Sequence, residues 1–120
     1  MKDERFSFSD CTLTRSMAVI GTKWKPIIVW VIQDRKIRFG QLDAYISLIT
    51  RKVLTEQLKE LEEDGLVIRE AFSETPPRVE YSLTKKGLDL LPILSNVVEW
   101  YDNYEPNEKY KVIKKEKVEK

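Results

Sequence analysis

Apolar positions follow a helical period along most of the chain. Residues 27–32 are apolar on nearly every side, which predicts a buried central helix that begins near Pro26. Apolar residues at helical spacing predict another helix, which runs from Thr50, a capping residue, to about Asp64. Similar patterns predict three further helices, from Ser9 or Asp10 to about Ile20, from about Gly40 to Ile46, and from Thr84 to about Tyr104.

Extended segments separate these helices. Residues 66–72 and 79–83 are predicted strands, and two adjacent prolines lie in the turn between them. Residues 37–39 are predicted to form a short extended piece, and Gly65 is expected to end a helix in the left-handed conformation. The order helix, helix, short strand, helix, helix, hairpin, helix predicts a mainly α winged helix-turn-helix with the β-hairpin as its wing.

The predicted elements make one domain. A chain of 120 residues is long enough for a single compact core. We assign residues 10–104 to this domain, residues 1–9 to a flexible arm, and residues 105–120, which are mostly Lys and Glu, to a loose charged tail.

The composition excludes several classes of function. The chain has no histidine and one cysteine, Cys11, which excludes histidine-based acid–base catalysis and an internal disulfide framework and disfavours zinc. The four glycines are too far apart to form a phosphate-binding loop. We therefore expect no enzyme activity, cofactor or metal. The chain has no apolar run long enough to span a membrane, and its first residues lack the apolar segment of a signal peptide. We therefore expect a cytoplasmic protein without a membrane partner.

The helix predicted from Thr50 to Asp64 has its charges arranged against the helix dipole. It begins with Arg51 and Lys52 and ends with an acidic cluster, and each exposed charge so placed costs about 0.3–1 kcal/mol. A polyanion at the N-terminal end would offset this cost, because cations and free N–H groups would face its phosphates. The alternative is a solvated helix face with local pairs such as Lys52–Glu56.

The predicted wing carries a second set of cations. Arg78 follows the two prolines, and a single arginine on a rigid protrusion suits the narrow, negative minor groove of A·T-rich DNA. Arg69, on the opposing strand, is expected near phosphates. The alternative is a surface arginine at position 78 that pairs with Glu74 or Glu80.

The segments "IGTKWKPIIVWVI", "TRKVLTEQLKELEEDGLVIRE" and "PPRVEYSLTKKG" resemble the HxlR-type family of winged-helix transcription regulators, which are related to MarR-like regulators. The resemblance implies a homodimer that binds a near-palindromic operator in double-stranded DNA. The chain departs from the family pattern at Ser47-Leu48, where the family usually has Pro-Gly. Without the glycine, this turn must avoid a positive φ or accept strain. Matched positions imply DNA contacts by Lys23, Lys25, Thr50, Arg51, Lys52, Thr55 and Arg78.

The last predicted helix has more apolar side chains than one small domain can cover. Such an excess indicates an association surface, and a twofold interface between copies of the chain would use it. The alternative, in which this helix wraps its own domain, accounts for about a third of these residues. The predicted interface comprises Leu13, Met17, Ile20, Leu90, Leu94, Val97, Val98 and Tyr101.

Two functional hypotheses stay open: a sequence-specific DNA-binding regulator, and a winged-helix interaction or dimerisation module that does not recognise DNA sequence. Clustering of Lys25, Arg51, Lys52, Arg69 and Arg78 on one face would favour the first, whereas scattering them would favour the second. Cys11 is either a redox or electrophile sensor, at a helix start that favours thiolate, or a small apolar residue in the dimer interface. The sequence leaves the operator, the direction of regulation and any small-molecule or electrophile effector undetermined.

Overall fold

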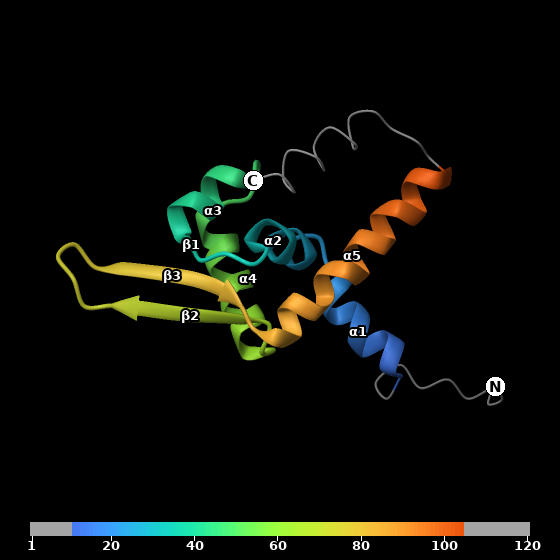
Figure 1. The fold of residues 1–120 in the computed structure, drawn as a ribbon, viewed down its shortest axis with the longest axis horizontal. Helices are drawn as coiled ribbons and strands as arrows, with labels where there is room; N and C mark the ends of the chain where they lie inside the picture. Colours follow the sequence, from blue (N-terminus) through green and yellow to red (C-terminus); the bar gives the residue numbers. More distant parts are fainter. Residues whose placement is uncertain (1–10, 105–120) are drawn as a thin grey trace.

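The computed structural model describes residues 11–104, and the arm and tail predicted from the sequence lie outside them. Within this range the elements follow the predicted order, which confirms the winged helix-turn-helix fold (Figure 1). They are α1 (Thr12–Ile20), α2 (Lys25–Ile32), β1 (Ile37–Arg38), α3 (Phe39–Tyr45), α4 (Arg51–Glu63), β2 (Val67–Phe72), β3 (Arg78–Leu83) and α5 (Lys85–Tyr104). No helix among the described residues has the length and apolar character needed to cross a membrane.

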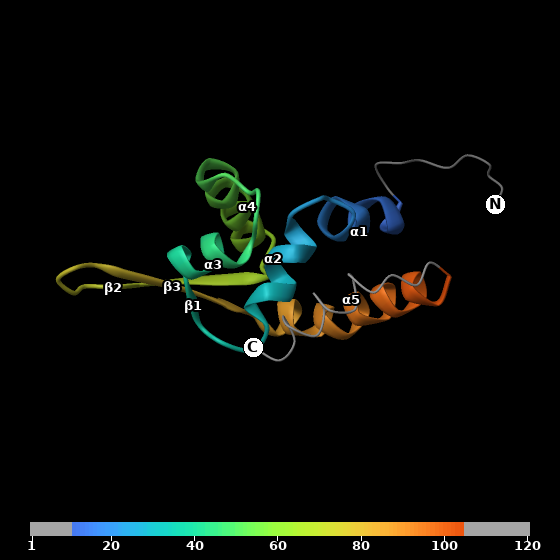
Figure 2. The same cartoon turned by 90° about the horizontal axis from the view of Figure 1, so that it is seen from above.

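The elements are arranged around α2. The hairpin of β2 and β3 projects from one end of the molecule, and α5 extends toward the other (Figures 1 and 2). The three strands form an antiparallel sheet in the order β1-β3-β2. Both views place α3, α4 and the hairpin on one side of α2, and α1 with the far end of α5 on the other side.

Most helix ends follow from local sequence. Thr50 caps α4, since its hydroxyl oxygen accepts a hydrogen bond from the Val53 N–H at 3.1 Å. Gly65 follows α4 with a φ of 79°, as predicted. The predicted start of α1 at Ser9 or Asp10 is wrong. The helix begins at Thr12, because Cys11 is the extended N-cap residue and its carbonyl accepts the first helical hydrogen bond, from the Arg15 N–H at 3.1 Å.

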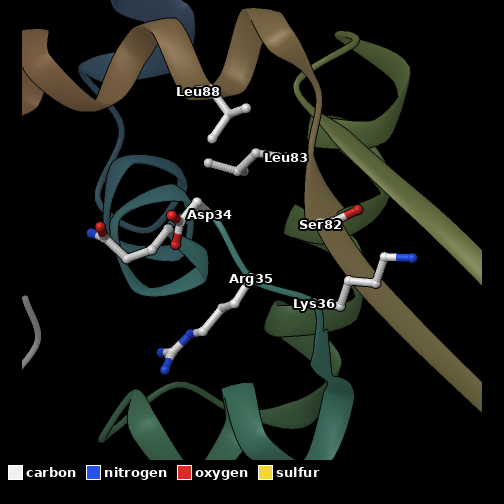
Figure 3. A pocket seen from close by; sticks show the side chains of 7 residues that line it. Asp34, Arg35, Lys36, Ser82, Leu83 and Leu88 are labelled. Carbon is white, nitrogen blue, oxygen red and sulfur yellow. The ribbon is translucent and has the colours of Figure 1, made fainter.

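The connection from α2 to β1 borders a small pocket. Figure 3 shows Leu83 and Leu88 close together on one side of it, while Arg35 and Lys36 extend in opposite directions from the connection. The volume of about 140 Å³ is below the roughly 300–1,000 Å³ that is typical of small-molecule sites. The pocket therefore does not support an effector site. It is lined by Gln33, Asp34, Arg35, Lys36, Ser82, Leu83 and Leu88.

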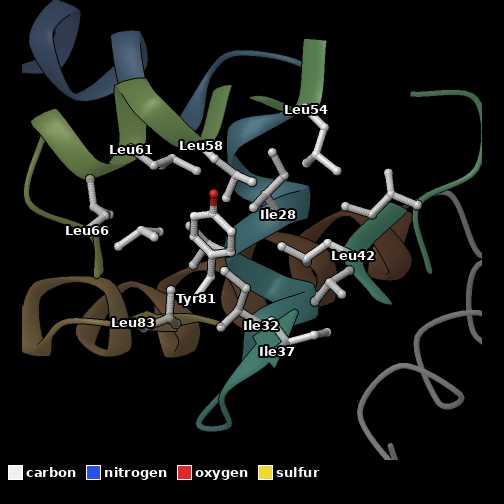
Figure 4. Close-up of a cluster of buried hydrophobic side chains, with 14 of the residues drawn as sticks. Ile28, Ile32, Ile37, Leu42, Leu54, Leu58, Leu61, Leu66, Tyr81 and Leu83 are labelled. Atoms are coloured by element: carbon white, nitrogen blue, oxygen red, sulfur yellow. The ribbon is translucent and has the colours of Figure 1, made fainter. Parts of the chain in front are cut away.

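The core lies where α2 meets α4 and the sheet. Figure 4 shows the ring of Tyr81 among aliphatic side chains of α2 and α4. This confirms the prediction that α2 is the central helix and that α4 turns one apolar stripe inward. The side chains that are almost fully removed from water include Ile28, Val29, Ile32, Leu54, Leu58 and Leu61.

Candidate nucleic-acid interface

The first turn of α4 presents polar side chains to solvent. Thr50, Arg51, Lys52 and Thr55 are all exposed. The Arg51 guanidinium lies 3.3 Å from the Asp43 carboxylate and 5.1 Å from the centre of the Phe39 ring, both on α3. Because the Arg51 side chain is 71% exposed, this ion pair contributes little to stability and can exchange for an anion from solution.

Lys52 is differently placed. Within the described part of the chain its ammonium group has no ion-pair partner, and the expected local pair with Glu56 does not form there. A cation at the N-terminal end of a helix, beside N–H groups that the helix does not use, favours binding of an anion.

The acidic end of α4 is held by Lys25, whose side chain is only 9% exposed. Its ammonium nitrogen lies 2.8 Å from Glu60 Oε1 and 3.7 Å from Asp64 Oδ2. The Lys86 ammonium also donates a hydrogen bond to the Asp64 carbonyl at 2.8 Å. This buried side chain is thus engaged at the opposite end of α4 from Thr50, and its predicted phosphate contact stays a prediction that the ion pairs disfavour.

The two arginines of the wing lie on opposite faces of the sheet. Arg69 is paired across the ladder with Tyr81, and Arg78 with Phe72. Directly paired residues share a face, and side chains alternate along a strand. Since Tyr81 faces α2 and α4, Arg69 lies on the face that carries α4, whereas Arg78 lies on the other face.

Arg78 is also engaged within the wing. Its guanidinium lies 3.2 Å from the Glu74 carboxylate, 3.4 Å from the Glu80 carboxylate and 3.9 Å from the centre of the Phe72 ring. The sequence left two interpretations of Arg78 open, a contact with the minor groove and an ion pair with Glu74 or Glu80. In the free protein the ion pairs form. This guanidinium contacts both strands of the hairpin, and its predicted contact with the minor groove of DNA stays a prediction.

The five cations whose clustering on one face would favour DNA recognition are thus only partly gathered on one face. Arg51, Lys52 and Arg69 lie on the first turn of α4 and on the wing face that carries α4. Lys25 is buried, and Arg78 lies on the opposite face. Lys23 is exposed in the α1–α2 connection, with its ammonium 4.8 Å from the centre of the Trp24 ring.

Both α1 and α5 expose large apolar side chains, which together we call the α1/α5 surface. The expected interface residues Leu90 and Leu94 do not belong to it, because they are buried in the core of their own domain at 9% and 8% exposure. The apolar pattern of the sequence did not distinguish the side of α5 that packs on the core from the side that is exposed. The exposed members are Leu13, Met17, Ile93, Val97, Trp100, Tyr101 and Tyr104, while Ile20 and Val98 are partly exposed.

Cys11 is half-buried at the N-cap of α1. The backbone N–H of Thr14 lowers the pKa of the Cys11 thiol, and the Arg15 charge adds a smaller effect in the same direction. Desolvation opposes this shift without cancelling it. The helix start thus favours the thiolate, as the sequence predicts. Among the described residues, no cluster of three side chains could hold a metal ion.

The architecture is that of a known family. The HxlR-like helix-turn-helix family matches residues 19–109. The chain belongs to this family. An HTH-type transcriptional regulator of Methanothermobacter thermautotrophicus is 43% identical to this HxlR-like chain over 94 residues, which cover 78% of the chain and 72% of the relative.

Solved structures agree with the assignment. A MarR-family regulator from Porphyromonas gingivalis matches with a TM-score of 0.74 and 38% identity, over 80% of this chain and 94% of its own. The redox regulator HypR in its oxidised form matches with a TM-score of 0.72 and 43% identity, over 78% of this chain and 96% of its own. These relatives are named as regulators, and the chain is an HTH-type transcription regulator like them.

This HxlR-like chain has an unusual turn between α3 and α4. Leu48 has a φ of 74°, so the chain accepts the strain that the sequence analysis anticipates at a position without glycine. Sequence reasoning identified the turn but did not assign its leucine a role.

Proposed function

We propose that the protein regulates transcription by binding duplex DNA as a homodimer, sequence-selectively, at a near-palindromic operator. The observation that carries this proposal is the exposed first turn of α4, where Arg51 and Lys52 stand at the positive end of the helix and Lys52 has no partner among the described residues. This arrangement favours the binding of a polyanion, because cations and unused N–H groups lie together at the positive end of the helix. The acidic end of the same helix is neutralised within the domain, so it does not repel a polyanion bound at the other end.

In this proposal α4 enters the major groove with its N-terminal turn first. Arg51 exchanges Asp43 for a base edge, while Lys52 and the Thr50 hydroxyl contact phosphates and Thr55 lies toward the bases. Arg69 contacts the backbone from the wing, and Lys23 is a further phosphate contact. Neither Lys25 nor Arg78 is assigned a DNA contact.

The α1/α5 surface supports the dimer. Val97 and Tyr101 are 48% and 42% exposed, although large apolar side chains are normally buried. Packing two such surfaces about a twofold axis would hold two copies of α4 in a fixed relation. Half-sites are then expected about one helical turn apart, roughly 34 Å.

Selection of bound sequences from random duplex DNA, at about 0.15 M salt, tests the proposal. The expected result is an enriched inverted repeat, with a dimer in sedimentation at micromolar concentration. Val97→Asp is expected to give a folded monomer that binds the repeat much more weakly, while Lys85→Ala, which removes an exposed charge on α5, leaves the dimer intact. Equal affinity for all duplexes, or a monomeric wild-type protein, would contradict the proposal and favour the interaction module.

We propose further that oxidation of Cys11 changes operator affinity, since the thiol is accessible at a helix start that favours thiolate. Diamide oxidises two thiols to a disulfide and is itself reduced to the hydrazine, so the expected product is a Cys11–Cys11 bridge between protomers, visible on a non-reducing gel. Such a bridge would move α1 within the dimer. Operator affinity is expected to change in the wild type and not in Cys11→Ser, whose hydroxyl suits the N-cap position. Unchanged affinity of the fully oxidised wild type would make Cys11 structural.

A further inference from the structure

Leu48 combines two unfavourable features in the free protein. Its φ of 74° lies in the left-handed region, where a side chain with a Cβ is strained. Its side chain is also 93% exposed, so the leucine gains no burial in return. Glycine or asparagine at this position would avoid both penalties, since each tolerates a positive φ and neither exposes apolar surface.

The neighbours of Leu48 explain why the backbone takes this conformation. Ile46 and Ile49 are 4% and 8% exposed, so the turn is anchored in the core on both sides of the leucine. Thr50 then caps α4 immediately afterwards. The anchors determine the direction of the chain, but they do not require leucine at position 48.

The position of Leu48 indicates which partner could use an apolar side chain. The α3–α4 connection lies across α2 from the far end of α5, as Figures 1 and 2 both show, so the α1/α5 surface does not include it. Instead, Leu48 lies in the chain directly before Thr50, Arg51 and Lys52. An anion attracted to these groups brings its own surface up to the leucine.

We propose that Leu48 is an apolar DNA contact that packs against carbon atoms of the operator at the edge of the major groove. This inference rests on the proposed function and adds to it a contact that no charged side chain supplies. Leucine cannot hydrogen-bond to phosphates or base edges, so its partners are apolar carbons, which duplex DNA offers as thymine methyl groups and as deoxyribose. Removal of this side chain from water on binding offsets the cost that it imposes on the free protein.

Leu48→Gly tests the inference, because stability and affinity should change in opposite directions. Relief of the strain is expected to raise Tm by about 4 °C, while loss of the apolar contact weakens operator binding roughly tenfold. Leu48→Asn is expected to behave in the same way, and Leu48→Met to retain more affinity than either.

Gln33→Gly is the matched control. Gln33 also has a positive φ, 57°, but it lies at the C-terminal end of α2 and not beside the first turn of α4. Its replacement is expected to relieve backbone strain, although it also removes the hydrogen bond that the Gln33 side chain donates to the Trp30 carbonyl at 2.6 Å. Operator affinity is expected to stay unchanged.

Replacing the thymines of the selected operator by deoxyuridine, one at a time, distinguishes the two sources of apolar carbon. A thymine methyl contact predicts one position in each half-site at which the wild type loses affinity and Leu48→Gly does not. A deoxyribose contact predicts no such position, although Leu48→Gly still binds more weakly. If the wild type binds its operator and Leu48→Gly binds it equally well, the inference is wrong and the proposed function stands. If the wild type selects no duplex, both fail.

Discussion

Lys25→Ala is expected to lower the free energy of unfolding by about 2 kcal/mol, without changing the salt dependence of DNA binding. The substitution removes a buried ammonium and leaves Glu60 and Asp64 facing each other at the C-terminal end of α4. Loss of one partner from a fully buried pair costs about 3–5 kcal/mol. The smaller value applies here because the side chains of Glu60 and Asp64 are 51% and 40% exposed and remain partly hydrated.

Urea unfolding followed by tryptophan fluorescence measures this effect. Trp24 directly precedes the substituted residue, and Trp30 lies on the same helix. Lys59→Ala is the matched control: Lys59 is an exposed lysine on α4, and its loss is expected to change stability by no more than about 0.5 kcal/mol. A lost phosphate contact would instead reduce the slope of log K against log salt by about 0.9 per contact. A reduced slope with unchanged stability would show that Lys25 contacts DNA.

Arg51→Ala is expected to weaken binding to the selected operator by about 10- to 100-fold and to relax the preference at one base position. A bidentate arginine contact distinguishes a base pair by about 1–3 kcal/mol. Protein stability should change little, because the ion pair that Arg51 forms with Asp43 is solvent-exposed on the arginine side. Affinities for a panel of operators, each with one mismatch, measure the effect.

Two neighbouring substitutions sharpen this test. Lys52→Ala is expected to weaken binding to all operators in the panel alike, since a phosphate contact carries no sequence information. Asp43→Asn removes the carboxylate that holds Arg51 in the free protein and is expected to strengthen binding. Identical loss profiles for Arg51→Ala and Lys52→Ala would show that Arg51 does not recognise a base.

Apart from the start of α1, the secondary-structure elements could be predicted from the amino-acid sequence, because their signals are local. A helical period, a capping hydroxyl at Thr50 and a glycine at position 65 act over a few residues, and each predicted the boundary that the structure shows. The exposed cations on the first turn of α4 could be identified in the same way. These residues project from a single helix, so their relation does not depend on how other elements pack.

The contacts between side chains of different elements could not be predicted in this way, because they depend on how the elements pack together. The matched sequence positions implied a phosphate contact for Lys25, but α2 packs against the acidic end of α4 and buries this side chain. The pairing register of β2 and β3 placed Arg78 away from α4, and packing of α5 on the core took Leu90 and Leu94 out of the predicted interface. An apolar or charged pattern shows which residues share a face, but the partner that covers the face comes from a distant part of the chain.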